Sequence, residues 1–300
     1  MRRIVYVAAG TVLLSLVLSA VAGWMIAPGM LHPRRGATGS LRQVACALEQ
    51  IGAEIQQFDV RASDGILLRG WKVRPPSPGG DWVLLFHGVT DNRTGMLGQA
   101  KPLLRHGYGV LMMDSRAHRE SGGNMATYGW KERDDTVAIT NALYANEQVR
   151  HLYAVGVSMG AAIALQAAAV EPRVDAVVAE DPFANLREVS YDYSGLRMSP
   201  VLGKTLFRPA SFFGMREIER KGGFNPDDVS PEKAVAIRPF AILLICGAYD
   251  RRIPCRHAER IYEAARGPKE LWIVRARHAA AFGQEPREYE ARVVDFFQKH

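Results

Sequence analysis

Hydrophobic residues form six short, unbroken runs between residues 82 and 274, separated by longer stretches of mixed polarity. A strand that is buried on both faces has no polar side and therefore appears as a continuous apolar run. The stretches between the runs are long enough for helices that would cover both faces of one sheet. The pattern predicts an α/β fold with a mostly parallel sheet, whose strands lie at residues 82–86, 108–114, 152–157, 176–180, 241–247 and 271–274.

A different pattern precedes these runs. Residues 57–61 alternate between polar and apolar, a Ser-Asp-Gly turn follows at residues 63–65, and residues 66–73 form a second extended stretch. This arrangement predicts an antiparallel hairpin at one edge of the sheet. Residues 41–51 carry apolar side chains at helical spacing, which predicts a short amphipathic helix after a small-residue linker.

The first 35 residues contain no charged residue between Arg3 and Arg34, and the apolar part covers residues 4–27. As a helix these residues would extend roughly 36 Å, enough to cross a bilayer with some tilt. We expect a single-pass membrane anchor that leaves the bulk of the chain on the non-cytoplasmic side. The alternative is a cleaved signal peptide with a small-x-small site at Ala20-Val21-Ala22, which would make the protein secreted or periplasmic. Arginines flank both ends, so the positive-inside rule does not decide the orientation.

Composition and charge exclude several classes of protein. The chain is 48% hydrophobic and 23% charged, which is typical of a globular protein and not of a disordered one. Four arginines in the first 35 residues supply four of the seven net positive charges, so residues 36–300 carry only +3 (7 − 4). That small surplus does not indicate a nucleic-acid partner. Three cysteines without a C-x-x-C spacing do not indicate a metal site.

Residues 156–160 read Gly-Val-Ser-Met-Gly and lie between a predicted buried strand and an alanine-rich helix. Glycines on either side of the serine allow a sharp strand-to-helix turn that lifts its hydroxyl out of the sheet, near the positive end of the helix. An ordinary serine at a helix N-terminus would need neither glycine. The motif therefore predicts that Ser158 is a nucleophile.

A serine needs a base that is oriented by a carboxylate, and in this kind of sheet the chain order is Ser, Asp, His. Asp250 follows the predicted strand 241–247, and His278 follows the strand 271–274. A competing acid is Asp181, at the end of the strand 176–180. Asp114 also ends a strand, but we expect it to form an ion pair with Arg116 in its own loop. The order of preference is Asp250, then Asp181, then Asp114.

Three further segments make the chain from about residue 55 to the end resemble a serine hydrolase of the α/β-hydrolase superfamily. They are Phe-His-Gly-Val at residues 86–89, DSRAHRESGG at residues 114–123 and Asp-Pro-Phe-Ala at residues 181–184. The resemblance is to the branch of single-domain, membrane-associated or secreted esterase-like proteins related to prolyl-oligopeptidase catalytic domains. It implies an eight-stranded sheet, a catalytic triad of Ser158, Asp250 and His278, and no metal or organic cofactor. The sequence departs from the usual pattern at Arg119 and Arg277, where glycine is common.

The resemblance also implies an oxyanion hole formed by the backbone N–H groups of Val89 and Met159. His87 would hold the turn before Val89 and not serve as a base. The expected activity is hydrolysis of carboxylic esters with small to medium apolar acyl groups through an acyl-enzyme. A thioesterase or a peptidase would use the same residues, and a catalytically silent, membrane-tethered scaffold is an alternative of another class.

Residues 1–35, 36–54 and 55–300 are expected to be an anchor or signal segment, a linker with a short helix, and the hydrolase domain. Within the last, about residues 183–237 contain no strand signal and predict a helical lid insertion. Its apolar residues would line the entrance to the site, and they include Leu202, Leu206, Phe207, Phe212 and Phe213. Cys246 lies in an apolar run, so we expect a free buried thiol there. The alternative is a disulfide with Cys255, which would staple the loop that carries Asp250.

Overall fold

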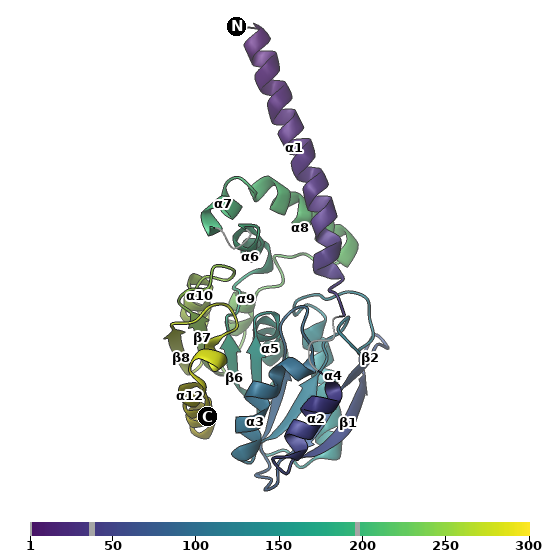
Figure 1. Cartoon of the computed structure of the whole chain (residues 1–300), viewed down its shortest axis with the longest axis vertical. Coiled ribbons are helices and arrows are strands. Elements are labelled where there is room, and N and C mark those ends of the chain that lie inside the picture. Colours follow the sequence, from purple (N-terminus) through teal and green to yellow (C-terminus); the bar gives the residue numbers. More distant parts are fainter. Residues whose placement is uncertain (1, 36–39, 196–198) are drawn as a thin grey trace.

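The computed structural model describes residues 2–35, 40–195 and 199–300, and its centre is one eight-stranded sheet (Figure 1). The strand order is β1-β2-β4-β3-β5-β6-β7-β8. β2 runs antiparallel to both of its neighbours, and every other pairing in the sheet is parallel. The predicted α/β fold class, with its antiparallel hairpin at one edge, is therefore confirmed. The strands are β1 (Glu54–Arg61), β2 (Leu67–Arg74), β3 (Trp82–Phe86), β4 (Gly109–Met113), β5 (Leu152–Val157), β6 (Val174–Glu180), β7 (Ala241–Gly247) and β8 (Lys269–Val274).

The strands β3, β5 and β7 have the predicted boundaries, because all of their residues are buried. β8 begins two residues earlier than the apolar run indicates. It is an edge strand whose first three residues are only half-buried, so Lys269 and Glu270 are tolerated at its start. β6 also begins earlier, and its polar Asp175 accepts a hydrogen bond from the N–H of Leu152 on β5.

Helices cover both faces of the sheet. Alternate residues of β3 belong to the two cores: Leu84 packs on one face, and Val83 and Leu85 pack on the other. The first face is covered by α4 (Glu132–Asn146), α5 (Met159–Val170) and α10 (Arg256–Ala264). The second face is covered by α2 (Leu41–Glu49), α3 (Leu97–Arg105) and α12 (Pro286–Lys299). The short helices η1 (Arg93–Met96) and α11 (Ala281–Gln284) lie in loops.

The segment between β6 and β7 is helical, as predicted for the insertion at about residues 183–237. It contains α6 (Leu186–Tyr193), α7 (Pro200–Lys204), α8 (Arg208–Gly222) and α9 (Pro231–Val235), and its described residues include no strand. Figure 1 shows α7 and α8 beyond the end of the sheet, on the side where α1 leaves the domain. The insertion therefore lies next to the N-terminal helix.

The N-terminal helix α1 (Arg2–Leu31) is long and apolar enough to cross a membrane, and it projects away from the domain (Figure 1). Its last turns, however, pack on the rest of the domain. At Gly23 a Cβ atom would lie 2.5 Å from the backbone nitrogen of Gly214, so the glycine allows close contact between α1 and α8. Ala27 and Leu31 are fully buried. The boundary expected at residue 35 rests on composition alone. In the structure the end of α1 packs against the rest of the domain, so the two segments are not separate there.

This packing predicts that two truncations differ in stability. Removing residues 1–22 deletes the mostly exposed part of α1 and a half-buried contact of Ala20 with α8, whereas removing residues 1–35 also takes Leu31 from the core. It also deletes Arg35, whose guanidinium donates to the carbonyl of Ser121 at 2.7 Å. Burying a leucine stabilises a fold by about 1.5–3 kcal/mol, and about 1 kcal/mol shifts Tm by roughly 2–4 °C at this size.

We therefore expect the longer deletion to melt about 5–10 °C below the shorter one, measured by differential scanning fluorimetry. Both deletions remove the exposed apolar residues between positions 4 and 21, but the shorter one keeps the exposed Trp24, Met25 and Ile26, so both proteins are compared in the same non-ionic detergent. Equal melting temperatures would show that the end of α1 contributes nothing to the domain.

Candidate active site

Ser158 lies in the tight turn between β5 and α5, at the carboxyl edge of the sheet. Its backbone has φ 57° and ψ −115°, in a region that residues other than glycine rarely adopt. The turn needs both flanking glycines: a Cβ at Gly160 would lie 2.0 Å from the carbonyl oxygen of Phe86, and one at Gly156 would lie 2.2 Å from that of Gly160. The structure thus forms the sharp turn that the motif predicts.

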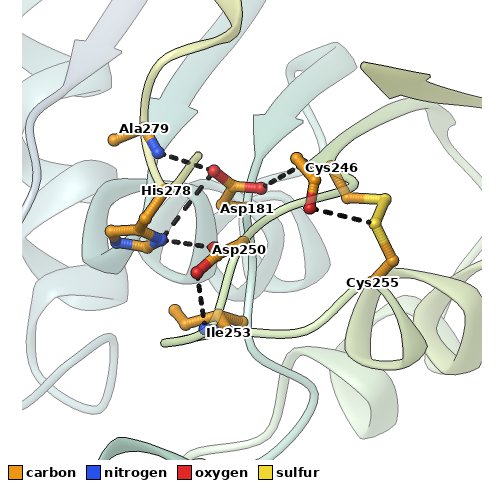
Figure 2. Close-up of a disulfide and its surroundings, with 8 residues drawn as sticks. Asp181, Cys246, Asp250, Ile253, Cys255, His278 and Ala279 are labelled. Carbon is orange, nitrogen blue, oxygen red and sulfur yellow. Dashed lines mark hydrogen bonds and ion pairs between the residues drawn. A yellow bond between two sulfur atoms is a disulfide. The ribbon is translucent and has the colours of Figure 1, made fainter. Parts of the chain in front are cut away.

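The structure brings Ser158, His278 and Asp250 together. The Nε2 atom of His278 lies 2.9 Å from the Oγ atom of Ser158, and its Nδ1 atom lies 2.6 Å from Oδ2 of Asp250. The other oxygen of Asp250 accepts the backbone N–H groups of Arg252 at 2.7 Å and Ile253 at 3.0 Å. Figure 2 shows the imidazole and this carboxylate facing each other. The three side chains form one hydrogen-bonded chain.

Asp181, the competing acid, is used differently. Its Oδ1 atom accepts the N–H of Gly247 at 2.8 Å, and its Oδ2 atom accepts the N–H of Ala279 at 2.7 Å (Figure 2). It lies 3.8 Å from Nδ1 of His278, farther than Asp250 does. Burial, and then the charge of Asp250, raise the pKa of Asp181 to about 6. The geometry favours Asp250 as the partner of the imidazole and gives Asp181 the role of holding two loops.

Glu180 is a residue of this site that the sequence analysis missed. Its Oε1 atom accepts the N–H of Ala281 at 2.9 Å, and its Oε2 atom has no partner among the residues that the structure describes. Two consecutive carboxyl groups, Glu180 and Asp181, therefore hold the backbone just after His278. The sequence feature that could have indicated this role is the acidic Glu180 at the end of the otherwise apolar run 176–180. Burial, and then the charge of Asp181, raise the pKa of Glu180 to about 8.

The raised pKa of Glu180 predicts a pH-dependent stability. The folded protein keeps a proton on this carboxyl that the unfolded chain releases above its ordinary value of 4.5. The stability contributed by this group is therefore undiminished below about pH 4.5 and falls as pH rises towards about 8. The raised pKa of Asp181 has the same effect: the stability that this carboxyl contributes falls as pH rises from its ordinary value of 3.8 towards about 6.

We expect Tm to fall as pH rises from about 4.5 to about 8, and Glu180→Gln to flatten this fall while retaining the acceptor for Ala281. Thermal scans of both proteins in matched buffers test this. An equally steep fall in the glutamine variant would show that another group causes the pH dependence.

The backbone N–H groups of Val89 and Met159 lie near Ser158. A Cβ atom at Gly88 would be 3.7 Å from the Cβ atom of Ser158, so the loop after β3 lies against the serine. Met159 is the first residue of α5. Within the described ranges neither N–H donates a hydrogen bond to another residue. Both N–H groups are therefore unpaired in the part of the chain that the structure describes.

His87 is buried and holds its own turn. Its Nδ1–H donates to the carbonyl of Gly88 at 2.8 Å, and its Nε2 accepts the N–H of Ser115 at 3.0 Å. Burial lowers the pKa of this imidazole. Both ring nitrogens are occupied, which fits a structural residue.

The expected ion pair between Asp114 and Arg116 is wrong. Asp114 pairs instead with Arg93, which donates to it through its backbone N–H at 2.9 Å and through Nη1 at 2.7 Å. Arg116 pairs with Asp135, with 2.7 Å between Nε and Oδ2. The loop turns at Arg119, whose backbone φ is 33°. An arginine therefore adopts the left-handed backbone conformation at a position where glycine is usual. Asp114 is therefore a structural residue.

Cys246 and Cys255 form a disulfide with their Cα atoms 5.5 Å apart. The expected free buried thiol at Cys246 is therefore wrong, and the alternative, the disulfide, is what the structure contains. The bridge joins the end of β7 to the start of α10 and closes the loop that carries Asp250 (Figure 2). The loop is thus held at both ends, beside the hydrogen bonds that Asp250 makes within it.

A groove of about 800 Å³ lies beside His278 and is lined by Ala248, Tyr249, Asp250, Arg251, Arg252, Arg277 and His278. The sequence predicts an entrance lined by apolar residues of the insertion, and none of those residues lines this groove. Phe213 lies instead against Gly23 of α1. The N-terminal helix therefore covers part of the apolar surface that we expected to face a substrate.

The fold and this site define a hydrolase of the α/β class. Residues 81–208 match the family model described as "alpha/beta hydrolase fold". The uncharacterised protein YqkD of Bacillus subtilis (strain 168) is 30% identical over 244 residues, which cover 80% of this chain and 78% of that protein. The chain belongs to the α/β-hydrolase superfamily.

Two solved structures share the fold. The Pyrococcus furiosus esterase Pf2001 is 23% identical, with a TM-score of 0.72 over 90% of this chain and 99% of the esterase. The Pyrococcus horikoshii acylaminoacyl peptidase is 18% identical, with a TM-score of 0.62 over 82% of this chain and 41% of the peptidase. At these identities the similarity shows a shared fold, and the predicted relationship to prolyl-oligopeptidase catalytic domains stays a prediction.

Proposed function

We propose that the protein is a serine hydrolase that cleaves carboxylic esters of small to medium apolar acyl groups. The observation that carries this proposal is the chain of hydrogen bonds from Ser158 Oγ to His278, at 2.9 Å, and on to Asp250, at 2.6 Å. A serine at its free pKa is a poor nucleophile, and this arrangement supplies both its base and the group that orients the base.

In the proposed reaction, Ser158 attacks the acyl carbonyl while Nε2 of His278 takes its proton. Asp250 accepts the Nδ1–H of His278, which selects the tautomer with a free Nε2 and stabilises the imidazolium that forms. The N–H groups of Val89 and Met159 donate to the oxyanion. The imidazolium then protonates the leaving alcohol, and water activated by the same histidine hydrolyses the acyl-enzyme.

Glu180 and Asp181 serve this reaction indirectly. They accept the N–H groups of Ala281 and Ala279, on the C-terminal side of His278. The imidazole must stay aligned with two partners at once, and a misplacement of 1 Å in a catalytic group can cost about 10²-fold in rate. We propose that these carboxyl groups are positioning residues.

A thioesterase or a peptidase would use the same triad, because acyl transfer does not specify the leaving group. A catalytically silent scaffold is disfavoured by the complete set of Ser158, Asp250 and His278. The test is to label the full-length protein with a fluorophosphonate probe and to compare acetyl, butyryl and octanoyl p-nitrophenyl esters with a butyryl thioester and a peptide amide. Labelling together with faster turnover of an ester supports the proposal. Faster cleavage of the amide would favour a peptidase, and no labelling would favour the scaffold.

We further propose that α1 is a single-pass anchor and that the hydrolase domain lies on the non-cytoplasmic side. No described residue in the most apolar 18-residue stretch of α1 is buried in the domain, and disulfides are typical of an oxidising compartment. A small-molecule acyl ester near the bilayer would then be the substrate. N-terminal mass analysis of the membrane fraction, with protease protection in spheroplasts, distinguishes this anchor from a cleaved signal peptide.

A further inference from the structure

The groove beside His278 is strongly basic. Arg251, Arg252 and Arg277 line it, and the one acidic residue among its lining residues is Asp250. The side chain of Asp250 is completely buried and is already occupied by His278 and two backbone N–H groups. It therefore does not balance the three positive charges.

The three guanidinium groups are also free of other partners. Across residues 2–35, 40–195 and 199–300, none of them makes a hydrogen bond or an ion pair through its side chain, and Arg251 and Arg277 are exposed. Arg256, at the start of α10, differs from these three arginines, because its side chain forms an ion pair with Asp192. A groove with three uncompensated guanidinium groups is suited to an anion, since guanidinium matches carboxylate and phosphate in charge and shape.

The position of the groove indicates which part of an ester would occupy it. In acyl transfer the histidine that deprotonates the serine later protonates the leaving oxygen, so the alcohol part must lie beside Nε2 of His278. His278 lines the groove that contains the three arginines. The alcohol part therefore enters the basic groove, whereas the carbonyl oxygen points towards Val89 and Met159.

We propose that the preferred substrates are esters whose alcohol part carries a carboxylate or a phosphate group, bound by Arg251, Arg252 and Arg277. This inference rests on the proposed esterase function and adds the charge of the leaving alcohol to it. Arg277 is one of the positions at which this sequence departs from the glycine common in the family. A positive groove would also attract such substrates before they bind.

The first test uses two chromogenic esters that differ by one charge. Full-length protein in a non-ionic detergent is given 4-butyryloxy-3-nitrobenzoate or the matching uncharged 4-butyryloxy-3-nitrobenzamide. We expect kcat/KM to be at least about tenfold higher for the anionic ester. The double variant Arg252→Gln/Arg277→Gln should lower this ratio about tenfold, and Arg277→Lys should retain more of it than Arg277→Gln.

Arg275→Gln is the matched control, because Arg275 is exposed two residues before Arg277 and does not line the groove. Its ratio should equal that of the wild type. A wild-type ratio of one or less, or an unchanged ratio in the double variant, would overturn the inference. Failure of the esterase function would look different: neither ester would be turned over, or Ser158→Ala would hydrolyse both.

A second test asks whether the anion belongs to a soluble ester or to a lipid headgroup. Butyryl glycerol 3-phosphate, in solution, and oleoyl glycerol 3-phosphate, in phosphatidylcholine vesicles, are compared with the corresponding uncharged monoacylglycerols. A phosphate preference in the butyryl pair alone points to a soluble substrate, and a larger preference in the vesicles points to a lipid. Equal rates within both pairs would contradict the inference.

Discussion

Replacing Ser158 by alanine is expected to abolish both fluorophosphonate labelling and ester turnover. Removing the nucleophile of such a triad costs on the order of 10⁶-fold in kcat, because His278 and Asp250 have nothing to activate without the hydroxyl. Steady-state hydrolysis of p-nitrophenyl butyrate and gel-based probe labelling measure this directly. The fold should survive, since the variant keeps the Cβ atom in the turn and loses one hydrogen bond to His278.

The control for this variant is Ser63→Ala, an exposed serine in the turn of the β1–β2 hairpin. It should label and turn over substrate like the wild type. The melting temperature of Ser158→Ala should stay within about 6 °C of the wild type, because one such hydrogen bond contributes only about 0.5–1.5 kcal/mol. Residual activity within tenfold of the wild type in a folded Ser158→Ala protein would remove Ser158 from the mechanism.

The sheet could be predicted from the sequence because its central strands are buried on both faces. β3, β5 and β7 have no exposed residue, so the apolar runs and the strands coincide. The edge strand β8 faces solvent on one side, and its polar first residues carry no such signal. Burial on two sides, not strand formation itself, is what the pattern detects.

The three residues of the candidate triad could be found for a related reason. Parallel strands end at the same edge of the sheet, so side chains that directly follow β5, β7 and β8 must lie near one another. Ser158, Asp250 and His278 all follow such strands. This rule does not predict contacts with residues that do not follow the carboxyl end of a parallel strand. Arg93 reaches Asp114 from a loop after β3, and no local pattern links the two.

The packing of α1 was also beyond the sequence pattern. Apolar residues of a membrane helix and of a core look alike in composition, so Leu31 reads as part of the anchor although it is buried in the domain. Gly23 gave no signal of a contact because its role depends on Gly214, nearly two hundred residues later. The charge of the groove beside His278 depends similarly on two separate loops.

The second large effect is expected from Asp250→Asn. Oδ1 of Asp250 accepts the N–H groups of Arg252 and Ile253, so the new side chain must keep its oxygen there. The amide NH₂ then faces Nδ1 of His278 and donates to it. The imidazole proton is forced onto Nε2, which points at Ser158 and can no longer accept its proton. This loss of the useful tautomer costs on the order of 10⁴-fold in kcat in other triads.

Asp181→Asn should behave in the opposite way. Both of its carboxylate oxygens accept backbone N–H groups, from Gly247 and Ala279, so any orientation of the amide places an NH₂ group against a donor. An unmet donor in a buried site costs about 1–3 kcal/mol, which lowers Tm. The imidazole keeps its bond to Asp250, and kcat should fall by about 10²-fold at most, through the displaced loop.

Measuring kcat and Tm for both variants therefore separates orientation of the base from support of its loop. Asp250→Asn should lose far more activity than Asp181→Asn, and Asp181→Asn should lose more stability. The two effects have different origins, because one carboxylate bonds to the reacting imidazole and the other bonds mainly to the backbone beside it. If Asp181→Asn instead lost about 10⁴-fold and Asp250→Asn remained active, the orienting acid would be the one at the end of β6.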